Sequence, residues 1–240
     1  MSRIFLLSPA NCAGARARLV MSERAAFPLA VRLRSEAGAP IGEVFSFMSG
    51  LYFRGKLAYA SAFASPPEPG APARAAGVFV ITPTAGLRSV ETPVTIDALR
   101  AFAGEDVAAD NPKYRQPLER SARAVASELG DCDVVLLGSI ASPKYVDVLL
   151  GIFGEKLKFP ADFVGRGDMS RGGLLLRCVS AAQELDYIPV AGSVRRGQRP
   201  PRLTPITGSI SGSPSAPSRT PRPEKSTRNL RFVSGAARPR

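Results

Sequence analysis

The stretch of the chain with the clearest chemical potential is residues 159–173, which combine four glycines, two arginines and two aspartates ahead of an apolar run. A helix that begins here presents unpaired backbone N–H groups and the positive end of its dipole, which attract anions. The sequence predicts an anion site at the start of a helix within Gly165–Gly173. Its expected phosphate- or ligand-binding residues are Arg166, Ser170, Arg171 and Gly172, with Asp168 as the candidate acid or base. The alternative is an internal arginine–aspartate clamp that holds a long loop.

Three other loops of small polar residues each follow a short apolar run. The runs are residues 4–7, 78–81 and 133–138, and the loops are residues 8–14, 82–86 and 139–142. The loops after parallel strands open onto one edge of the sheet, where ligands bind in open α/β folds. We therefore expect one shared pocket, although such residues are also usual in strand-to-helix turns. Its candidate ligand-binding residues are Ser8, Asn11, Cys12, Thr84, Gly86, Ser139, Ser142 and Lys144.

The chain contains no histidine, which excludes histidine-dependent nucleophilic catalysis and histidine-ligated metals. Its three cysteines are widely spaced and indicate neither a disulfide framework nor a zinc site. A thiolate at Cys12 would gain from a following helix start, whereas Cys132 and Cys178 are expected in the core. The glycine pattern at residues 165–173 is neither a Walker A motif nor a dinucleotide fingerprint, so we expect no cofactor and no metal.

Short apolar runs alternate with helical patterns, which predicts an α/β fold. We expect three layers, with a mainly parallel short sheet flanked by helices. Two further short strands are expected at residues 156–159 and 187–190. The expected helical stretches are residues 15–37 with a break at Pro28, residues 41–64 with a joint near Gly50 or Gly55, a short helix after Thr95, a helix from Asn111–Pro112 to Gly130, one from Ser142–Pro143, and one from Ser170.

Two basic residues, Arg54 and Lys56, lie among the aromatic residues of the helical stretch 41–64. One interpretation is a pair of core helices whose basic side chains extend to water. The other is an aromatic and basic surface that holds a base and a phosphate. For Tyr145, which belongs to an apolar helical stripe, we expect a place in the core.

Positive charge is concentrated at the end of the chain. Residues 194–240 hold eleven Lys/Arg and one Glu, a net charge of +10, whereas residues 1–193 hold 21 basic and 19 acidic residues, a net of +2. We expect a single α/β domain over residues 1–193 and a disordered basic tail, rich in Pro, Ser and Arg, over residues 194–240. The tail arginines expected to meet nucleic acid are Arg195, Arg196, Arg199 and Arg202, the alternative being a solvated tail.

No apolar run is long enough to span a membrane, and residues 1–7 lack the features of a signal peptide. The sequence therefore predicts a cytoplasmic protein without a membrane partner. It indicates no oligomeric state.

Three segments carry a family resemblance: Leu6–Cys12 with its cysteine loop, Leu51–Arg54 followed by Tyr59–Ala60, and Val80–Leu87. Their order over residues 4–153 resembles the uncharacterised bacterial and phage proteins related to YaaA. Two features depart from that pattern, since Thr82–Pro83–Thr84 replaces the usual Ser-Ala and the basic residue near the cysteine moves to Arg16. The resemblance implies a compact α/β fold and a link to DNA, nucleobases or stress response. It implies no settled reaction.

Together these features predict a nucleic-acid- or nucleotide-associated protein that acts on a nucleobase or a glycosidic bond. In this hypothesis Arg166 and Arg171 hold phosphate, and Asp168 transfers a proton. One alternative is a non-enzymatic regulatory or interaction module. A second alternative is a transferase or hydrolase that acts on a small anionic metabolite. Whether the protein is an enzyme is left open by the sequence.

Overall fold

The computed structural model describes residues 1–67 and 77–204. A single compact unit covers Met1–Leu203, so the chain continues to pack on the domain beyond the expected boundary at residue 193. Gly165 shows this packing, because its backbone lies against the backbone of Gly197 and Gln198. Most of the expected basic tail, residues 205–240, lies outside the described residues.

In the described ranges a six-stranded sheet has the strand order β4-β3-β1-β6-β7-β8, and a two-stranded sheet pairs β2 with β5. The strands β3, β1, β6 and β7 are parallel to one another, whereas β4 and β8 run antiparallel at the two edges. The strands are β1 (Arg3–Leu7), β2 (Ala39–Pro40), β3 (Val78–Thr82), β4 (Gly86–Ser89), β5 (Pro93–Val94), β6 (Asp133–Leu137), β7 (Leu157–Pro160) and β8 (Tyr187–Pro189).

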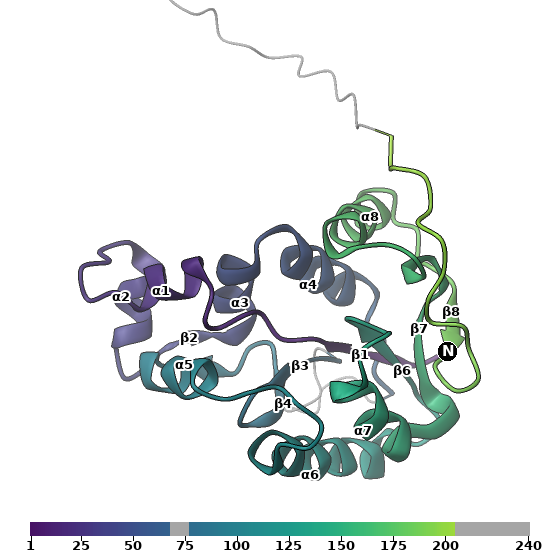
Figure 1. Cartoon of the computed structure of the whole chain (residues 1–240), viewed down its shortest axis with the longest axis horizontal. Coiled ribbons are helices and arrows are strands. Elements are labelled where there is room, and N and C mark those ends of the chain that lie inside the picture. Colours follow the sequence, from purple (N-terminus) through teal and green to yellow (C-terminus); the bar gives the residue numbers. More distant parts are fainter. Residues whose placement is uncertain (68–76, 205–240) are drawn as a thin grey trace, which may run out of the picture. The chain divides into compact units, whose positions relative to one another are not determined.

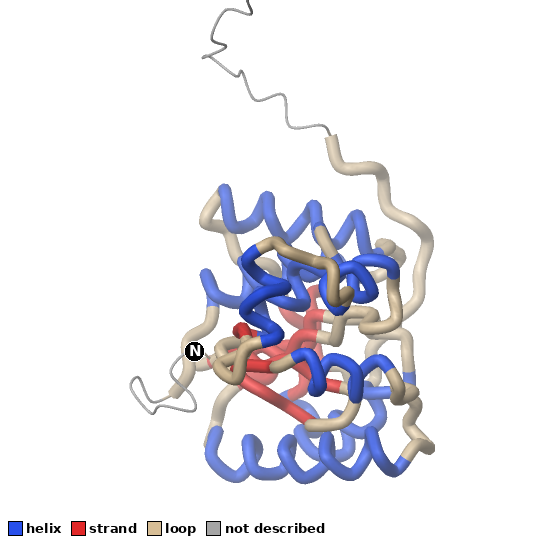
Figure 2. The backbone as a smooth tube through the Cα atoms, turned by 90° about the vertical axis from the view of Figure 1, so that its left-hand side faces the viewer, coloured by secondary structure: helices blue, strands red, loops and turns tan. Residues whose placement is uncertain are grey.

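The helices cover both faces of the large sheet, which gives the expected three-layer α/β fold (Figures 1 and 2). The helices of the described residues are α1 (Ala15–Met21), α2 (Pro28–Arg34), α3 (Ile41–Ser49), α4 (Leu51–Phe63), α5 (Ile96–Ala103), α6 (Pro112–Leu129), α7 (Pro143–Phe153) and α8 (Asp168–Ser180), with 3₁₀ turns η1 (Gly154–Lys156) and η2 (Ala161–Phe163). One layer contains α4 and α8, and the other contains α6 and α7. The helices α1, α2 and α5 lie beyond the carboxyl edge of the sheet (Figure 1).

The central strands have the continuous apolar sequences expected of a sheet that helices bury on both faces. Residues 4–7, 78–81 and 134–137 are continuous apolar runs, and all of them are buried. Parallel strands that helices cover on both sides have such continuous apolar runs, rather than an alternation of apolar and polar residues. Strand β1 lies between β3 and β6, in register through Phe5–Val78 and Phe5–Val135, so its carboxyl end lies at the centre of the sheet edge.

One expected loop has a different role. Residues 82–86 do not lead into a helix but close a hairpin between β3 and β4. Thr82 fixes this turn, because its Oγ1 donates to the Gly86 carbonyl at 2.8 Å and accepts the Ala85 N–H at 3.0 Å. Gly86 has a φ of +70°, which favours glycine, and a Cβ there would overlap the Pro117 carbonyl.

Helices α4 and α8 approach each other through glycine. A Cβ on Gly55 would lie 2.7 Å from the Gly172 carbonyl oxygen, and a Cβ on Gly172 would lie 2.8 Å from the Tyr52 Cα. Both distances are shorter than real Cβ contacts, so neither position accepts a side chain without separating the helices. The contact makes α4 and α8 one layer that carries residues of both helices to the same sheet edge.

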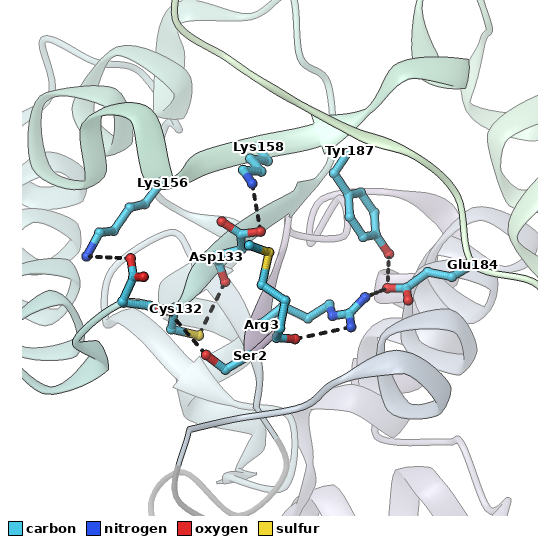
Figure 3. A network of polar contacts seen from close by, with 10 residues as sticks. Ser2, Arg3, Cys132, Asp133, Lys156, Lys158, Glu184 and Tyr187 are labelled. Atoms are coloured by element: carbon cyan, nitrogen blue, oxygen red, sulfur yellow. Dashed lines mark hydrogen bonds and ion pairs between the residues drawn. The ribbon is translucent and has the colours of Figure 1, made fainter.

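At the opposite, amino-terminal edge of the sheet, polar side chains join β1, β6, β7 and β8 (Figure 3). Lys158 Nζ contacts Asp133 Oδ2 at 2.7 Å, and Arg3 pairs with Glu184. Glu184 also accepts a hydrogen bond from the Tyr187 hydroxyl at 2.7 Å. These contacts tie the ends of neighbouring strands together and account for the charges of this edge without a ligand.

Candidate functional site

A cavity of about 570 Å³ opens at the carboxyl edge of the sheet. The loop after β1 and the loop between β6 and α7 form its floor together with α4, and the end of α5 closes one side. Its volume falls within the range of small-molecule sites, roughly 300–1,000 Å³. Loops from two of the three predicted strand ends contribute polar side chains to this cavity, so the pocket differs from the predicted one, which all three loops were to share.

The cavity collects only part of the expected site residues. Those that line it are Ser8, Asn11, Cys12, Ser139, Ser142, Lys144 and Asp168. Thr84 and Gly86 do not, because the β3–β4 hairpin uses them, and only Pro83 of that loop reaches the cavity. From the glycine- and arginine-rich stretch only Asp168 lines the cavity.

Arg171 is buried and directs its guanidinium into the protein. Its Nε and Nη2 donate to the Phe163 carbonyl at 3.2 and 2.8 Å, and its Nη1 donates to the Gly138 carbonyl at 3.2 Å. Asp168 Oδ1 lies 3.8 Å from Nη1, and the Phe163 ring lies under the guanidinium. Arg171 thus links α8 to η2 and to the end of β6, as the internal-clamp alternative describes. Gly172 serves the contact with α4 rather than a ligand.

Arg166 and Ser170 lie at a separate hollow of about 300 Å³, together with Arg199 and Arg202. Arg166 Nε donates to the Asp162 carbonyl at 2.9 Å, and its Nη1 contacts Ser170 Oγ at 3.4 Å. Of the other two arginines expected to meet nucleic acid, Arg195 contacts the Ile140 carbonyl at 3.5 Å and Arg196 is exposed. The structure therefore does not bring the predicted anion-binding residues together: some line the cavity, some lie at this hollow, and Thr84, Gly86, Arg171 and Gly172 line neither.

The centre of the cavity floor is Lys56, whose side chain is 1% exposed. Its Nζ donates to the Ser8 carbonyl at 2.7 Å and contacts Ser8 Oγ at 2.8 Å. The same atom lies 4.6 and 4.8 Å from the ring centroids of Tyr52 and Phe53. The expectation that this lysine extends to water was wrong, because it belongs to the buried stripe of α4, between Tyr52 and Tyr59.

Burial lowers the pKa of Lys56 to about 7, since an ammonium loses its hydration there. Asp168 opposes this shift by attracting the charge, and Arg171 adds to it by repulsion. Near neutral pH this amine is therefore divided between its charged and uncharged forms. Lysines with lowered pKa values are typical of functional sites, because only the uncharged form accepts a proton.

Two tyrosines complete the polar floor. Tyr145 is buried as expected, and its hydroxyl accepts the Ser139 N–H at 3.0 Å. Burial raises the pKa of Tyr145, opposed by this hydrogen bond and by the Ser8 hydroxyl beside it. Burial raises the pKa of the Tyr52 hydroxyl, and the nearby Arg171 guanidinium offsets part of this shift, yet no hydrogen bond of good geometry joins the two groups.

Cys12 lies in the cavity wall as a thiol. Its Sγ contacts the Ala10 carbonyl at 3.6 Å, and burial raises its pKa to about 12. The expected gain from the following helix start is therefore absent, and the thiolate required for nucleophilic chemistry is not favoured. Cys132 and Cys178 are also buried, as expected for core positions.

The charge of the cavity is mixed, with an acidic excess. Its lining contains the carboxylates of Glu105, Asp106 and Asp168, against the amines of Lys144 and Lys56. The Asn111 amide holds the pKa of Glu105 below its ordinary value, so this carboxylate stays charged. Asp168 also occupies the first turn of α8, where an anionic ligand was expected. Arg171 lies 3.8 Å from Asp168 and Lys113 lies 3.6 Å from Glu105, so these two carboxylates are partly balanced. The lining itself offers no excess of positive charge for a phosphate.

The lining residues that were not among the predicted site residues include Lys56, Tyr52, Glu105 and Asp106, although Lys56 was considered for an aromatic and basic surface. A signal for Lys56 was present, because it lies four residues after Tyr52 and three before Tyr59, in the middle of an apolar helical face. Glu105 and Asp106 gave no such signal, since only the tertiary fold brings the loop after α5 to the strand ends.

In the part of the chain that the structure describes, no helix has the length and apolar character needed to cross a membrane. The same part contains no group of three or more acidic or cysteine side chains placed to hold a metal ion. Comparison with family models, with curated proteins and with solved structures finds no match for this chain. The resemblance to proteins related to YaaA stays a prediction. A function can therefore be inferred only from the cavity and the residues that line it.

Proposed function

We propose that the cavity at the carboxyl edge of the sheet binds a neutral, polar small molecule of the nucleobase or nucleoside class. The observation that carries this proposal is the set of buried polar groups on the cavity floor, namely Ser8, Lys56, Tyr52 and Tyr145. Buried donors and acceptors on a cavity floor provide the few directed hydrogen bonds that orient a ligand. Their burial among aromatic rings suits a planar, partly apolar molecule.

The charges of the lining refine the ligand class. Three carboxylates around the cavity oppose a phosphate group, and the arginines expected to hold one are directed elsewhere. This supports a nucleobase or nucleoside rather than a nucleotide, and it disfavours a small anionic metabolite.

The test is a thermal-shift series with nucleobases, nucleosides and their 5′-monophosphates. A ligand at about 100 times its Kd stabilises the native state by about 2.7 kcal/mol, a shift that is readily measured. We expect nucleosides to raise the Tm more than the corresponding monophosphates. The substitution Ala13→Trp, at an exposed residue of the cavity rim, is expected to abolish the shift. The matched control Ala101→Trp, on the exposed side of α5, is expected to retain it. Equal shifts in both variants, or no shift with any compound, contradict the proposal.

A second candidate function is nucleic-acid binding through the basic end of the chain. It is favoured by the hollow that brings Arg166, Arg199 and Arg202 together, and by the +10 net charge that the sequence of residues 194–240 carries. Such binding depends steeply on salt, because neutralised phosphates release counterions. Fluorescence anisotropy with single-stranded DNA tests it. Replacing Arg166, Arg199 and Arg202 together by Ala in the full chain is expected to lose most of the affinity and to reduce the salt dependence, and unchanged binding refutes this candidate.

A further inference from the structure

Ser8 is held as a nucleophile would be. Its N–H donates to the Leu137 carbonyl at 3.1 Å and so extends the β1–β6 pairing by one residue. Its carbonyl accepts from Lys56 at 2.7 Å. With both backbone groups bound, the Ser8 hydroxyl is fixed at the cavity floor, 2.8 Å from the Lys56 amine.

The surroundings of Lys56 favour the uncharged amine, which is the form that a general base requires. This residue is 1% exposed, and its amine lies 4.6 and 4.8 Å from the ring centroids of Tyr52 and Phe53. The charged groups that face it are Asp168 and Arg171, both on α8, and they act on its charge in opposite directions. Burial is the dominant influence, and it favours the uncharged amine.

The surroundings of Ser8 are shaped for this pair. A Cβ on Gly138 would lie 2.8 Å from the Ser8 Cβ and 3.1 Å from its Oγ, so the close approach of the two chains requires glycine there. The Tyr145 hydroxyl lies beside the Ser8 side chain and accepts the Ser139 N–H at 3.0 Å. A phenol is also a donor, so this hydroxyl can turn its hydrogen toward an oxygen that becomes negative next to Ser8.

From this geometry we infer that Ser8 and Lys56 form a catalytic serine–lysine pair that cleaves acyl bonds, such as esters, of small neutral molecules. The inference rests on the proposed function, since the same cavity must admit the substrate. A lysine can serve as the general base for a serine where histidine is absent, and this chain has none.

The reaction balances with water as the only co-reactant. Ser8 Oγ attacks the carbonyl carbon, and its proton passes to the uncharged Lys56 amine. The tetrahedral oxyanion collapses and the bond to the leaving alcohol breaks, with the alcohol oxygen taking the proton from the Lys56 ammonium. Water then attacks the acyl-serine ester and gives a proton to Lys56, which returns it to Ser8 Oγ as the acid is released.

The test is covalent labelling of the full chain with a neutral alkyl fluorophosphonate, followed by mass spectrometry of the intact protein and its peptides. Ser8 Oγ displaces fluoride from phosphorus, so the adduct is expected on Ser8. The labelling rate is expected to be half-maximal near pH 7 and to fall about tenfold per pH unit below it, as the amine becomes charged. Hydrolysis of a p-nitrophenyl ester is expected to follow the same profile.

Variants separate the pair from a merely structural contact. Ser8→Ala is expected to give no adduct, and Lys56→Met to slow labelling by about 100-fold or more. Lys56→Arg is expected to be as slow as Lys56→Met, because a guanidinium keeps its proton. Ser127→Ala, which removes an exposed serine of α6, is the matched control and is expected to label at the wild-type rate.

The inference is overturned if Ser8 stays unlabelled, if the rate is flat from about pH 6 to 9, or if Lys56→Met labels at the wild-type rate. Should circular dichroism show that Lys56→Met is unfolded, the wild-type pH profile decides. Nucleoside binding by the wild type, measured beside its labelling, distinguishes the two proposals. Binding without labelling leaves the proposed function and removes the inference. Labelling of Ser8 without any nucleoside binding keeps the serine–lysine pair but removes the nucleoside class as the ligand of the cavity.

Discussion

Replacing Lys56 by Met tests whether the amine is as strongly desolvated as its position implies. Its pKa falls from 10.5 to about 7 in the native state, whereas the unfolded chain keeps the ordinary value. Between these two values the unfolded state binds a proton that the native state lacks, so the free energy of unfolding rises with pH. The contribution is complete above pH 10.5 and is lost as the pH falls towards 7.

The size of the effect follows from about 1.36 kcal/mol per pH unit. From about pH 7 to about pH 8.5 the wild type is expected to gain about 1.5 kcal/mol from this group. The absolute stability of Lys56→Met is less informative, because losing the donor to the Ser8 carbonyl costs roughly 1–3 kcal/mol at every pH. The diagnostic quantity is therefore the slope.

The assay is urea unfolding of wild type and Lys56→Met at several pH values in this window. Subtracting the two curves removes the groups they share, including Cys12, whose raised pKa lowers stability as the pH increases. We expect the difference to grow by about 1.5 kcal/mol across the window. Parallel curves refute the reasoning, because they mean that Lys56 keeps its proton in the native state.

Three further substitutions probe the architecture of the site. Gly138→Ala places a Cβ 2.8 Å from that of Ser8, so we expect a loss of about 1–3 kcal/mol in urea unfolding and slower Ser8 labelling; unchanged values for both contradict the close approach. Arg171→Met leaves the buried Gly138 carbonyl without its donor, whereas the Phe163 carbonyl keeps the Arg166 N–H, and is expected to cost about 1–3 kcal/mol; intact stability with lost ligand binding would instead identify Arg171 as a ligand group. Gly55→Ala is expected to cost about 1–3 kcal/mol by separating α4 from α8, and adding Gly172→Ala to cost less than the sum of the single effects; strict additivity argues against a shared contact.

The sequence was sufficient for the layers of the fold because local patterns determine them. Continuous apolar runs marked β1, β3 and β6, and cap residues marked several helix starts. At α6, for example, the Asn111 side chain accepts the Lys113 N–H as an N-cap should. The edge strand β4 was missed, because residues 82–86 have a composition that suits a hairpin as well as a strand-to-helix turn.

The candidate site was predictable in place but only partly in chemistry. Strand order sends the loops after β1 and β6 to one edge, and Ser8 and Ser139 were expected there. The predicted environments of Arg171 and Lys56 differ from the observed ones, however. Arg171, expected to hold a ligand, is buried as an internal clamp, and Lys56, expected to extend to water, lies on the cavity floor. An arginine beside glycines suggests an exposed anion site, but which carbonyls it meets depends on how η2 packs. A lysine side chain is usually expected to reach solvent, and only the tertiary structure shows that Lys56 instead binds Ser8 inside the protein.

The glycine contact between α4 and α8 also determines which mutations the chain can accumulate. Any side chain larger than hydrogen at Gly55 or Gly172 forces the two helices apart, so substitutions at one position cannot be rescued by a smaller residue at the other. Lys56 is the neighbour of Gly55, and Arg171 the neighbour of Gly172. In a saturation library selected for folding alone, we therefore expect glycine at both positions. Selection for function should add constraint at the residue next to each.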